Sequence, residues 1–264
     1  MKSFRMTWQQ LIGVALLLVA TCWTPVVTGQ CTENVDCNHA GNCVDGKCVC
    51  DPPFSGDTCA SFQLYSYPSE DGGLQIKSGN TTWGGSVVRV EQTDEQTGEV
   101  SVSYHMYAAM MKNNLTLNSW LHDSVVAHAV STSGRPEGPY EFADIALDSG
   151  SDRWDGVTVH NPDAKMLPDG TIAIFYMGSN NHSAPVPKGG NLLEFNQRVG
   201  VAFSKDPAGP WQRLPKPIID IGEKGAWDDG FTTNPAPYIY PNGSVLVIYK
   251  ARSFEKPSDM YQGV

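Results

Sequence analysis

The chain has 264 residues, of which 17% are charged, and it contains 26 glycines and 18 prolines. Many turn-forming residues and few charges are typical of an all-β globular protein. The formal net charge of −10 argues against a nucleic acid partner, which requires a basic surface, and favours solubility.

Residues 1–29 are predicted to form a secretory signal peptide. Lys2 and Arg5 precede an apolar run over residues 11–20, and small residues follow near Gly29. The run is too short to span a bilayer comfortably, so cleavage after Gly29 and a secreted, extracellular chain are expected. The alternative is an uncleaved anchor. Because no later stretch is apolar enough to cross a membrane, the mature chain is predicted to have no membrane span.

Residues 30–60 contain six of the seven cysteines. In a secreted chain this predicts a disulfide framework rather than a zinc site, and spacing alone leaves its connectivity open. The spacing C-x5-C-x5-C-x4-C-x-C-x8-C and the ending CVCDPPFSGDTC resemble the epidermal growth factor (EGF)-like module. The resemblance implies a cell-surface protein as partner and the pairs Cys31 with Cys43, Cys37 with Cys48 and Cys50 with Cys59. No acidic residue directly precedes Cys31, so neither calcium nor another metal is expected.

Residues 61–82 are predicted to be a linker that contains at most one stray strand. Four Asn-x-Ser/Thr sequons predict N-glycosylation at Asn80, Asn114, Asn181 and Asn242. We expect at least two of them to be occupied, and Asn242 lies at the tip of a predicted hairpin.

Residues 83–264 contain an internal repeat. Asn161 and Asn234 are 73 residues apart (234 minus 161), and the same offset relates Trp154 to Trp227. A repeat of this length indicates one supersecondary unit that has been copied.

Each copy reads as a set of short strands. Pro-Asp-Gly at 168–170 and Pro-Asn-Gly at 241–243 are tight-turn sequences, and each joins two short runs rich in Ile, Val, Phe and Tyr. A third strand follows, and a fourth is expected at 144–147 in one copy and at 217–220 in the next. Four antiparallel strands in each copy predict the blades of a β-propeller.

The propeller is incomplete. A degenerate first copy begins at Trp83, and the third copy begins at Trp227 and stops at Val264. Two and a half to three blades cannot close a ring without exposing sheet edges. We therefore expect a fragment of a longer protein; the alternative is a ring completed by several chains.

Several motifs together suggest a family. WGGSVV at Trp83, HNP at 160–162, TNP at 233–235, DGTIAIFYMGS and SKDPAGPWQRL resemble the five-bladed β-propellers of glycoside hydrolase family 43 and the related arabinanase, levansucrase and invertase enzymes. The resemblance covers residues 83–264. It implies a secreted glycoside hydrolase that acts on a polysaccharide without a cofactor, using carboxylates of different blades in an axial funnel.

The chain departs from this pattern at the acidic positions. Members of the family usually carry Asp before the inner-strand proline, where this chain has Asn161 and Asn234, and Gly85 and Ser86 occupy the region in the first copy. An amide cannot act as a general base at neutral pH. The candidate catalytic acids are therefore the nearby Asp155, Asp163 and Asp228; the alternative for each is a turn or cap that shapes the loop.

The candidate substrate-binding residues are Trp83, His160, Asn161 and Asn234. Trp83 would stack on a sugar, and His160 would either bind a hydroxyl or hold the strand opening. Asn161 and Asn234 are predicted to face one common pocket. The repetition of Trp154 and Trp227 favours packing between blades, and Lys250 and Arg252 are expected at the surface.

The predicted function is glycoside hydrolysis. The alternative is a non-catalytic propeller that binds a glycan or a protein at the cell surface, as the two asparagines and the EGF-like module suggest. No G-x-S-x-G, HExxH or phosphate-loop motif indicates another chemistry.

Overall fold

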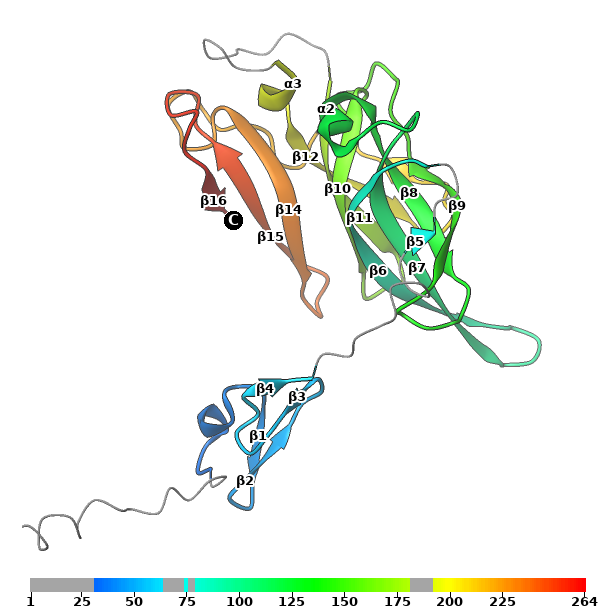
Figure 1. Ribbon diagram of the computed structural model, residues 1–264, viewed down its shortest axis with the longest axis vertical. Helices are drawn as coiled ribbons and strands as arrows, with labels where there is room; N and C mark the ends of the chain where they lie inside the picture. The colour runs from blue at the N-terminus through cyan, green and yellow to red at the C-terminus, as the bar shows by residue number, and fades with distance from the viewer. Residues whose placement is uncertain (1–30, 64–73, 76–78, 181–191) are drawn as a thin grey trace, which may run out of the picture. The chain divides into compact units, whose positions relative to one another are not determined.

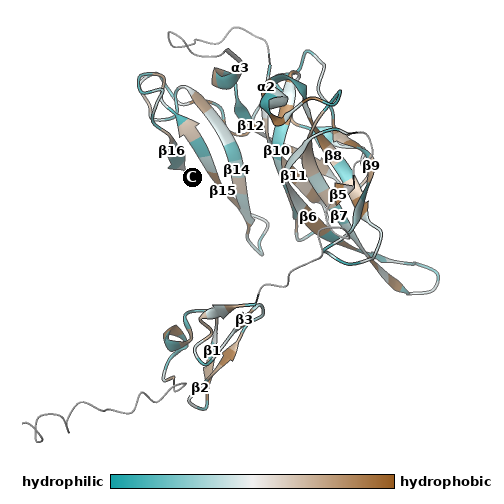
Figure 2. Ribbon diagram, in the orientation of Figure 1, coloured by the Kyte–Doolittle hydropathy of each residue, from teal (hydrophilic) through white to brown (hydrophobic). Residues whose placement is uncertain are grey.

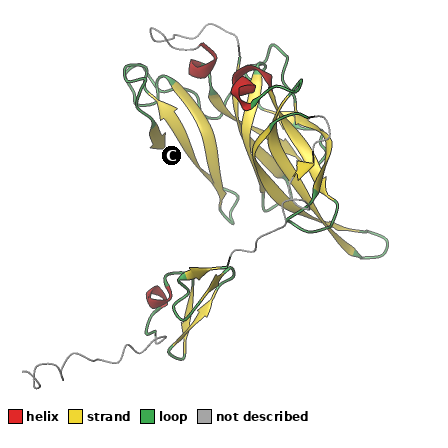
Figure 3. Cartoon of the chain, in the orientation of Figure 1, coloured by secondary structure: helices red, strands yellow, loops and turns green. Residues whose placement is uncertain are grey.

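A computed structural model describes residues 31–63, 74–75, 79–180 and 192–264 (Figure 1). The chain divides into two compact units, Met1–Ser66 and Tyr67–Val264, which are described separately. Nearly all of the regular structure is β (Figure 3). The predicted signal peptide lies outside the described residues. Among the described helices, none has the length and apolarity needed to cross a membrane.

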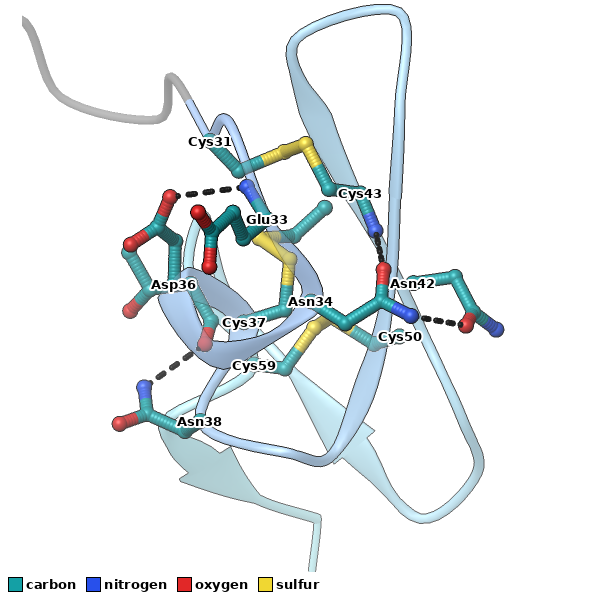
Figure 4. Close-up of a disulfide and its surroundings, with 12 residues drawn as sticks. Cys31, Glu33, Asn34, Asp36, Cys37, Asn38, Asn42, Cys43, Cys50 and Cys59 are labelled. Atoms are coloured by element: carbon teal, nitrogen blue, oxygen red, sulfur yellow. Dashed lines mark hydrogen bonds between the residues drawn. A yellow bond between two sulfur atoms is a disulfide. The ribbon is translucent and has the colours of Figure 1, made fainter.

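The first unit contains one 3-10 helix and two antiparallel strand pairs. They are η1 (Asn34–Cys37), β1 (Gly41–Val44) paired with β2 (Lys47–Cys50), and β3 (Phe54–Ser55) paired with β4 (Ser61–Phe62). Three disulfides connect these elements, and they confirm all of the predicted pairs (Figure 4): Cys31 with Cys43, Cys37 with Cys48, and Cys50 with Cys59.

The interior of this unit consists almost entirely of disulfide sulfur. Its buried cluster comprises three cysteines and Ala40, with the other three cysteines packed against it. A side chain at Gly41 would place its Cβ 2.9 Å from the sulfur of Cys59, so the close approach requires glycine. Because so few apolar side chains are buried, the crosslinks supply most of the stability.

The second unit consists of three sheets with short helices between them. The first sheet has the order β5 (Leu74–Gln75), β9 (Tyr140–Leu147), β8 (Ser124–Ser131), β7 (Val100–Met111) and β6 (Thr82–Thr93). The second runs β10 (Thr158–Met166), β11 (Ile172–Ser179), β12 (Arg198–Ser204) and β13 (Gln212–Arg213). The third runs β14 (Phe231–Ile239), β15 (Val245–Arg252) and β16 (Tyr261–Gly263). The helices are η2 (Leu117–Ser119), α2 (Trp120–Asp123) and α3 (Leu192–Phe195).

The three sheets are successive blades of a partial β-propeller. Strand β10 contacts β6 on one side and β14 on the other, so the first strands of the three sheets lie next to one another (Figure 1). In each sheet the following strands are added outward from this shared centre, antiparallel and in chain order, except β5 at the outer edge of the first sheet, which comes earlier in the chain and pairs parallel with β9. This arrangement confirms the predicted all-β class and the duplicated sheet.

The structure differs from the sequence prediction in one strand and in the extent of the linker. The expected fourth strand at 217–220 is absent from the second sheet, whose fourth strand is β13, and Ile219 makes only an isolated bridge with Val199. Pro215 and Pro217 lack the backbone N–H that a strand ladder requires. The segment predicted as linker, 61–82, includes β4, β5 and the first residue of β6.

The core of the second unit joins the first two sheets. Hydrophobic stretches alternate with hydrophilic ones along the strands (Figure 2), as expected where one face of a sheet is buried. The largest buried cluster draws on both sheets and includes Val88, Tyr107, Leu147, Val159, Ile174 and Tyr176. This shared core fixes the inner strands of the two blades side by side.

Candidate functional site

Each of the three inner strands contains a β-bulge near its start. The bulges fall between Trp83 and Gly85, between His160 and Asp163, and between Thr233 and Ala236. In each bulge one residue has a positive φ: Gly84 (43°), Asn161 (48°) and Asn234 (50°). Glycine and asparagine tolerate this left-handed conformation better than other residues. The bulge corrects the sequence alignment, because Gly84 rather than Gly85 is equivalent to the two asparagines.

The bulges bring the two asparagines into contact. Asn161 donates a hydrogen bond from Nδ2 to Oδ1 of Asn234 over 2.7 Å, and Thr233 donates from Oγ1 to the same oxygen over 3.0 Å. A Cβ on Gly84 would lie 3.9 Å from Oδ1 of Asn161, so the third strand also reaches this point. The remaining amide atoms, Oδ1 of Asn161 and Nδ2 of Asn234, have no bonding partner among the described residues.

A pocket of about 310 Å³ opens where the inner strands meet. Its lining includes all four predicted substrate-binding residues, Trp83, His160, Asn161 and Asn234. The prediction that the two asparagines face one common pocket is therefore confirmed. Trp83 is 51% exposed, which leaves much of its ring free to contact a ligand.

His160 is a neutral, anchored member of the pocket. Its side chain is buried, its Nδ1 lies 2.8 Å from Oγ of Ser124, and the ring of Trp120 lies 5.4 Å away between centroids. Burial lowers the pKa of His160 to about 4, so the imidazole is uncharged at neutral pH. A neutral imidazole held at Nδ1 retains Nε2 as a hydrogen-bonding atom for a ligand.

The lining also includes residues that were not predicted as ligand contacts, among them Trp120, Glu194 and Lys250. Trp120 belongs to α2 and Glu194 to α3, in segments between the repeated strands. Lys250 lies on β15 opposite Thr233. The repeat could not identify the first two because they lie between repeated strands, and Lys250 was expected at the surface.

None of the predicted catalytic carboxylates lines this pocket. Asp155 is completely buried, and its carboxylate accepts hydrogen bonds from Tyr176 Oη (2.7 Å), Arg213 Nη1 (3.0 Å) and Arg153 Nε (3.1 Å). This position argues against a catalytic role, because the carboxylate is inaccessible to substrate and already paired. Of the two arginine partners, Arg153 is near in sequence, whereas Arg213 is 58 residues away and could not be connected to Asp155 by spacing.

The other two candidates also make local contacts. Asp163 forms an ion pair with Lys165 over 2.7 Å. Asp228 accepts a hydrogen bond from Tyr249 Oη over 2.9 Å, which repeats the contact between Tyr176 and Asp155. Neither contact is the turn or cap that was the alternative for these residues, and neither side chain lines the pocket.

The repeated tryptophans pack against strands of their own blade, whereas the repetition predicted packing between blades. The ring of Trp154 stacks on Tyr176 with centroids 5.9 Å apart, and a Cβ at Gly200 would lie 2.6 Å from the indole. Trp227 covers Gly263 in the same way in the third sheet. Because the indole occupies the space of a side chain, this position of the third strand requires glycine in both sheets.

A polar chain outside the pocket connects three strands of the first sheet. His105 Nδ1 lies 2.9 Å from His128 Nε2, and His128 Nδ1 lies 3.1 Å from Asp144 Oδ2. Desolvation, followed by the neighbouring His128, lowers the pKa of His105 to about 4. At neutral pH His105 is therefore uncharged and bonds β7 to β8.

Among the described residues, the one group of three metal-type ligands that lie close together is Cys31, Cys37 and Cys48. Their sulfur atoms form disulfides and so cannot act as thiolate ligands.

The predicted glycosylation sites differ in accessibility. Asn114 and Asn242 are exposed, whereas Asn80 is half-buried and its Oδ1 accepts a hydrogen bond from the backbone of Asn114 over 2.9 Å. Asn181 lies outside the described residues. Asn114 and Asn242 are thus the more accessible of the described sequons.

The first unit matches a known family. The tenascin EGF domain family matches residues 34–60, which agrees with the three disulfides and identifies the unit as an EGF-like module. A search of curated protein sequences found no significant match.

Similar solved structures include several glycoside hydrolases. A family 117 glycoside hydrolase from the marine bacterium Zobellia galactanivorans is 17% identical, with 75% of this chain covering 54% of that one and a TM-score of 0.48. A thermostable family-43 glycoside hydrolase is 18% identical, the match covers 67% of this chain and 53% of that one, and the TM-score is 0.43. An α-L-arabinofuranosidase from Lactobacillus brevis is 11% identical, the match covers 69% of this chain and 49% of that one, and the TM-score is 0.44. The chain therefore spans about half the length of these structures.

Proposed function

We propose that the pocket at the inner strands binds a glycan presented outside the cell. The observation that carries this proposal is the combination of Trp83 and Trp120 with polar amides and a neutral histidine in one pocket. Aromatic rings offer an apolar surface to the flat face of a sugar, and amide and imidazole groups bond its hydroxyls. Secretion and glycosylation at Asn114 and Asn242 belong to the same proposal.

The polar atoms suit hydroxyl groups because both hydrogen-bonding senses are available. Oδ1 of Asn161 accepts, and Nδ2 of Asn234 donates, since their other amide atoms are used in the bond between them. A sugar hydroxyl can donate and accept at once. A pocket that holds an acceptor and a donor on neighbouring strands can therefore orient a single hydroxyl.

Trp83→Ala is expected to weaken binding of an oligosaccharide by about tenfold or more, because the exposed ring supplies a stacking surface. Isothermal titration against a panel of arabinan, xylan, fructan and galactan oligosaccharides measures the change. Tyr238→Ala is the matched control: Tyr238 is 58% exposed on β14 but does not line the pocket. Equal losses in both variants, or no binding by the unaltered chain, would contradict the proposal.

The second candidate function is hydrolysis of a polysaccharide. The observation that favours it is the carboxylate of Glu194 in the pocket lining. Glycosidases in general use two carboxyl groups, which lie roughly 6.5 to 9.5 Å apart in inverting enzymes. Among the described residues Glu194 is the one acid of this pocket, so we propose Glu194 as one of these two carboxyl groups.

Glu194→Gln is expected to abolish any release of reducing sugar while leaving oligosaccharide binding within about threefold, since an amide preserves the shape but cannot transfer a proton. Sugar release from the four polysaccharides is the measurement. Glu255→Gln, an exposed acidic position outside this pocket, is the control. Binding without release by the unaltered chain would favour the non-catalytic function.

A further inference from the structure

One wall of the pocket presents hydrogen-bond donors without acceptors. Lys250 is half-buried and lines the pocket, and its ammonium group has neither an ion pair nor a hydrogen bond among the described residues. It is the cross-strand partner of Thr233, so it lies beside Asn234. Nδ2 of Asn234 is also free to donate, because both bonds to this amide end at its oxygen.

The other charges at this site do not neutralise Lys250. Glu194, the acid of the lining, accepts a hydrogen bond from Arg252 Nη1 over 2.7 Å, and Arg252 lies over the ring of Phe231. His160 is held neutral by its burial. The described lining therefore carries an unpaired positive charge, although the chain as a whole has a formal net charge of −10.

A partly buried cation without a counterion favours a ligand that brings the opposite charge. In an overall acidic chain such a local positive charge is not a consequence of composition. We propose that the glycan bound at this pocket is acidic, with a carboxylate or sulfate group held by Nζ of Lys250 and Nδ2 of Asn234. The proposal rests on the proposed function and specifies the class of sugar.

This proposal assigns each part of the ligand to one part of the pocket. The acidic group lies at the wall formed by β14 and β15, Oδ1 of Asn161 accepts from a hydroxyl, and the ring of Trp83 covers a sugar face. Charge-assisted hydrogen bonds are stronger than neutral ones, so the anionic group supplies the main preference among sugars.

Matched ligands that differ only in charge test the proposal on the full chain with its disulfides formed. One pair is an oligogalacturonate and its fully methyl-esterified form; the other is a sulfated galactan oligosaccharide and its desulfated form. We expect the acidic member of at least one pair to bind about tenfold more tightly, with the difference reduced at high salt. The pair that shows the difference identifies the acidic group.

Lys250→Gln is expected to remove this difference by weakening the binding of the acidic ligand about tenfold. Lys216→Gln, which removes an exposed lysine outside the pocket, is expected to leave it intact. Thermal unfolding of both variants checks that each is folded. Equal binding of acidic and neutral ligands would overturn the inference and leave glycan binding standing. Failure of all four ligands would overturn the inference, and failure of the arabinan, xylan, fructan and galactan panel as well would overturn glycan binding.

Discussion

Asp155→Ala is expected to lower the free energy of unfolding of the second unit by about 3 to 5 kcal/mol, the cost of breaking a buried ion pair from one side. The substitution leaves the guanidinium of Arg213, whose side chain is 9% exposed, without its buried partner, and it removes the acceptor of the Tyr176 hydroxyl. Urea denaturation followed by tryptophan fluorescence measures the change through the midpoint and slope of the transition.

The repeat provides the control for this experiment. Asp228 occupies the equivalent position in the third blade, but it is half-exposed and accepts one side-chain hydrogen bond, from Tyr249. Asp228→Ala is expected to cost about 1 kcal/mol, the value of one ordinary hydrogen bond. Unchanged stability of Asp155→Ala together with loss of sugar release would restore the catalytic interpretation of Asp155.

Replacing Cys37 and Cys48 together by serine is expected to unfold the EGF-like module at physiological temperature. Loss of a native disulfide from a small secreted domain costs about 2 to 5 kcal/mol, and this module has almost no other interior. Limited proteolysis with mass spectrometry measures the effect as rapid cleavage between residues 31 and 63. The second unit contains no cysteine, so its thermal transition is expected to stay unchanged.

Val35→Ser is the control within the same module, because Val35 is 52% exposed and takes no part in a disulfide. This variant is expected to resist the protease as the unaltered chain does. Protection of the double cysteine variant to the same extent would mean that the backbone hydrogen bonds of the module suffice, and would contradict the dependence on crosslinks.

The blade framework was predictable because it rests on local rules that occur twice. Gly170 and Gly243 have φ angles of 79° and 82°, as the two hairpin turns require. Tyr176 and Tyr249 face the equivalent glycines of the next strand, Gly200 and Gly263. Features fixed by turn chemistry and strand alternation recur at a constant offset, so one sequence reveals them.

The site was predictable only where the repeat conserves the residues. Asn161 and Asn234 meet as the offset indicates, whereas Trp120 and Glu194 reach the pocket from α2 and α3, short helices at equivalent places in the first two sheets whose sequences differ. The burial and pairing of Asp155 were not predictable for a related reason. Its partner Arg213 is 58 residues away in sequence, and only the folded second sheet brings the two together.

The residues that follow the two bulge asparagines also protect the pocket from deamidation. Each of its two asparagines is followed by a proline, Pro162 or Pro235, whose ring nitrogen carries no hydrogen. Spontaneous deamidation begins when the next residue's backbone nitrogen loses its hydrogen and attacks the side-chain amide, and that step is blocked here. Asn242, which precedes Gly243 at an exposed hairpin tip, has no such protection in molecules that carry no glycan there. Such molecules can therefore accumulate negative charge at this hairpin tip over time while the two pocket amides remain uncharged.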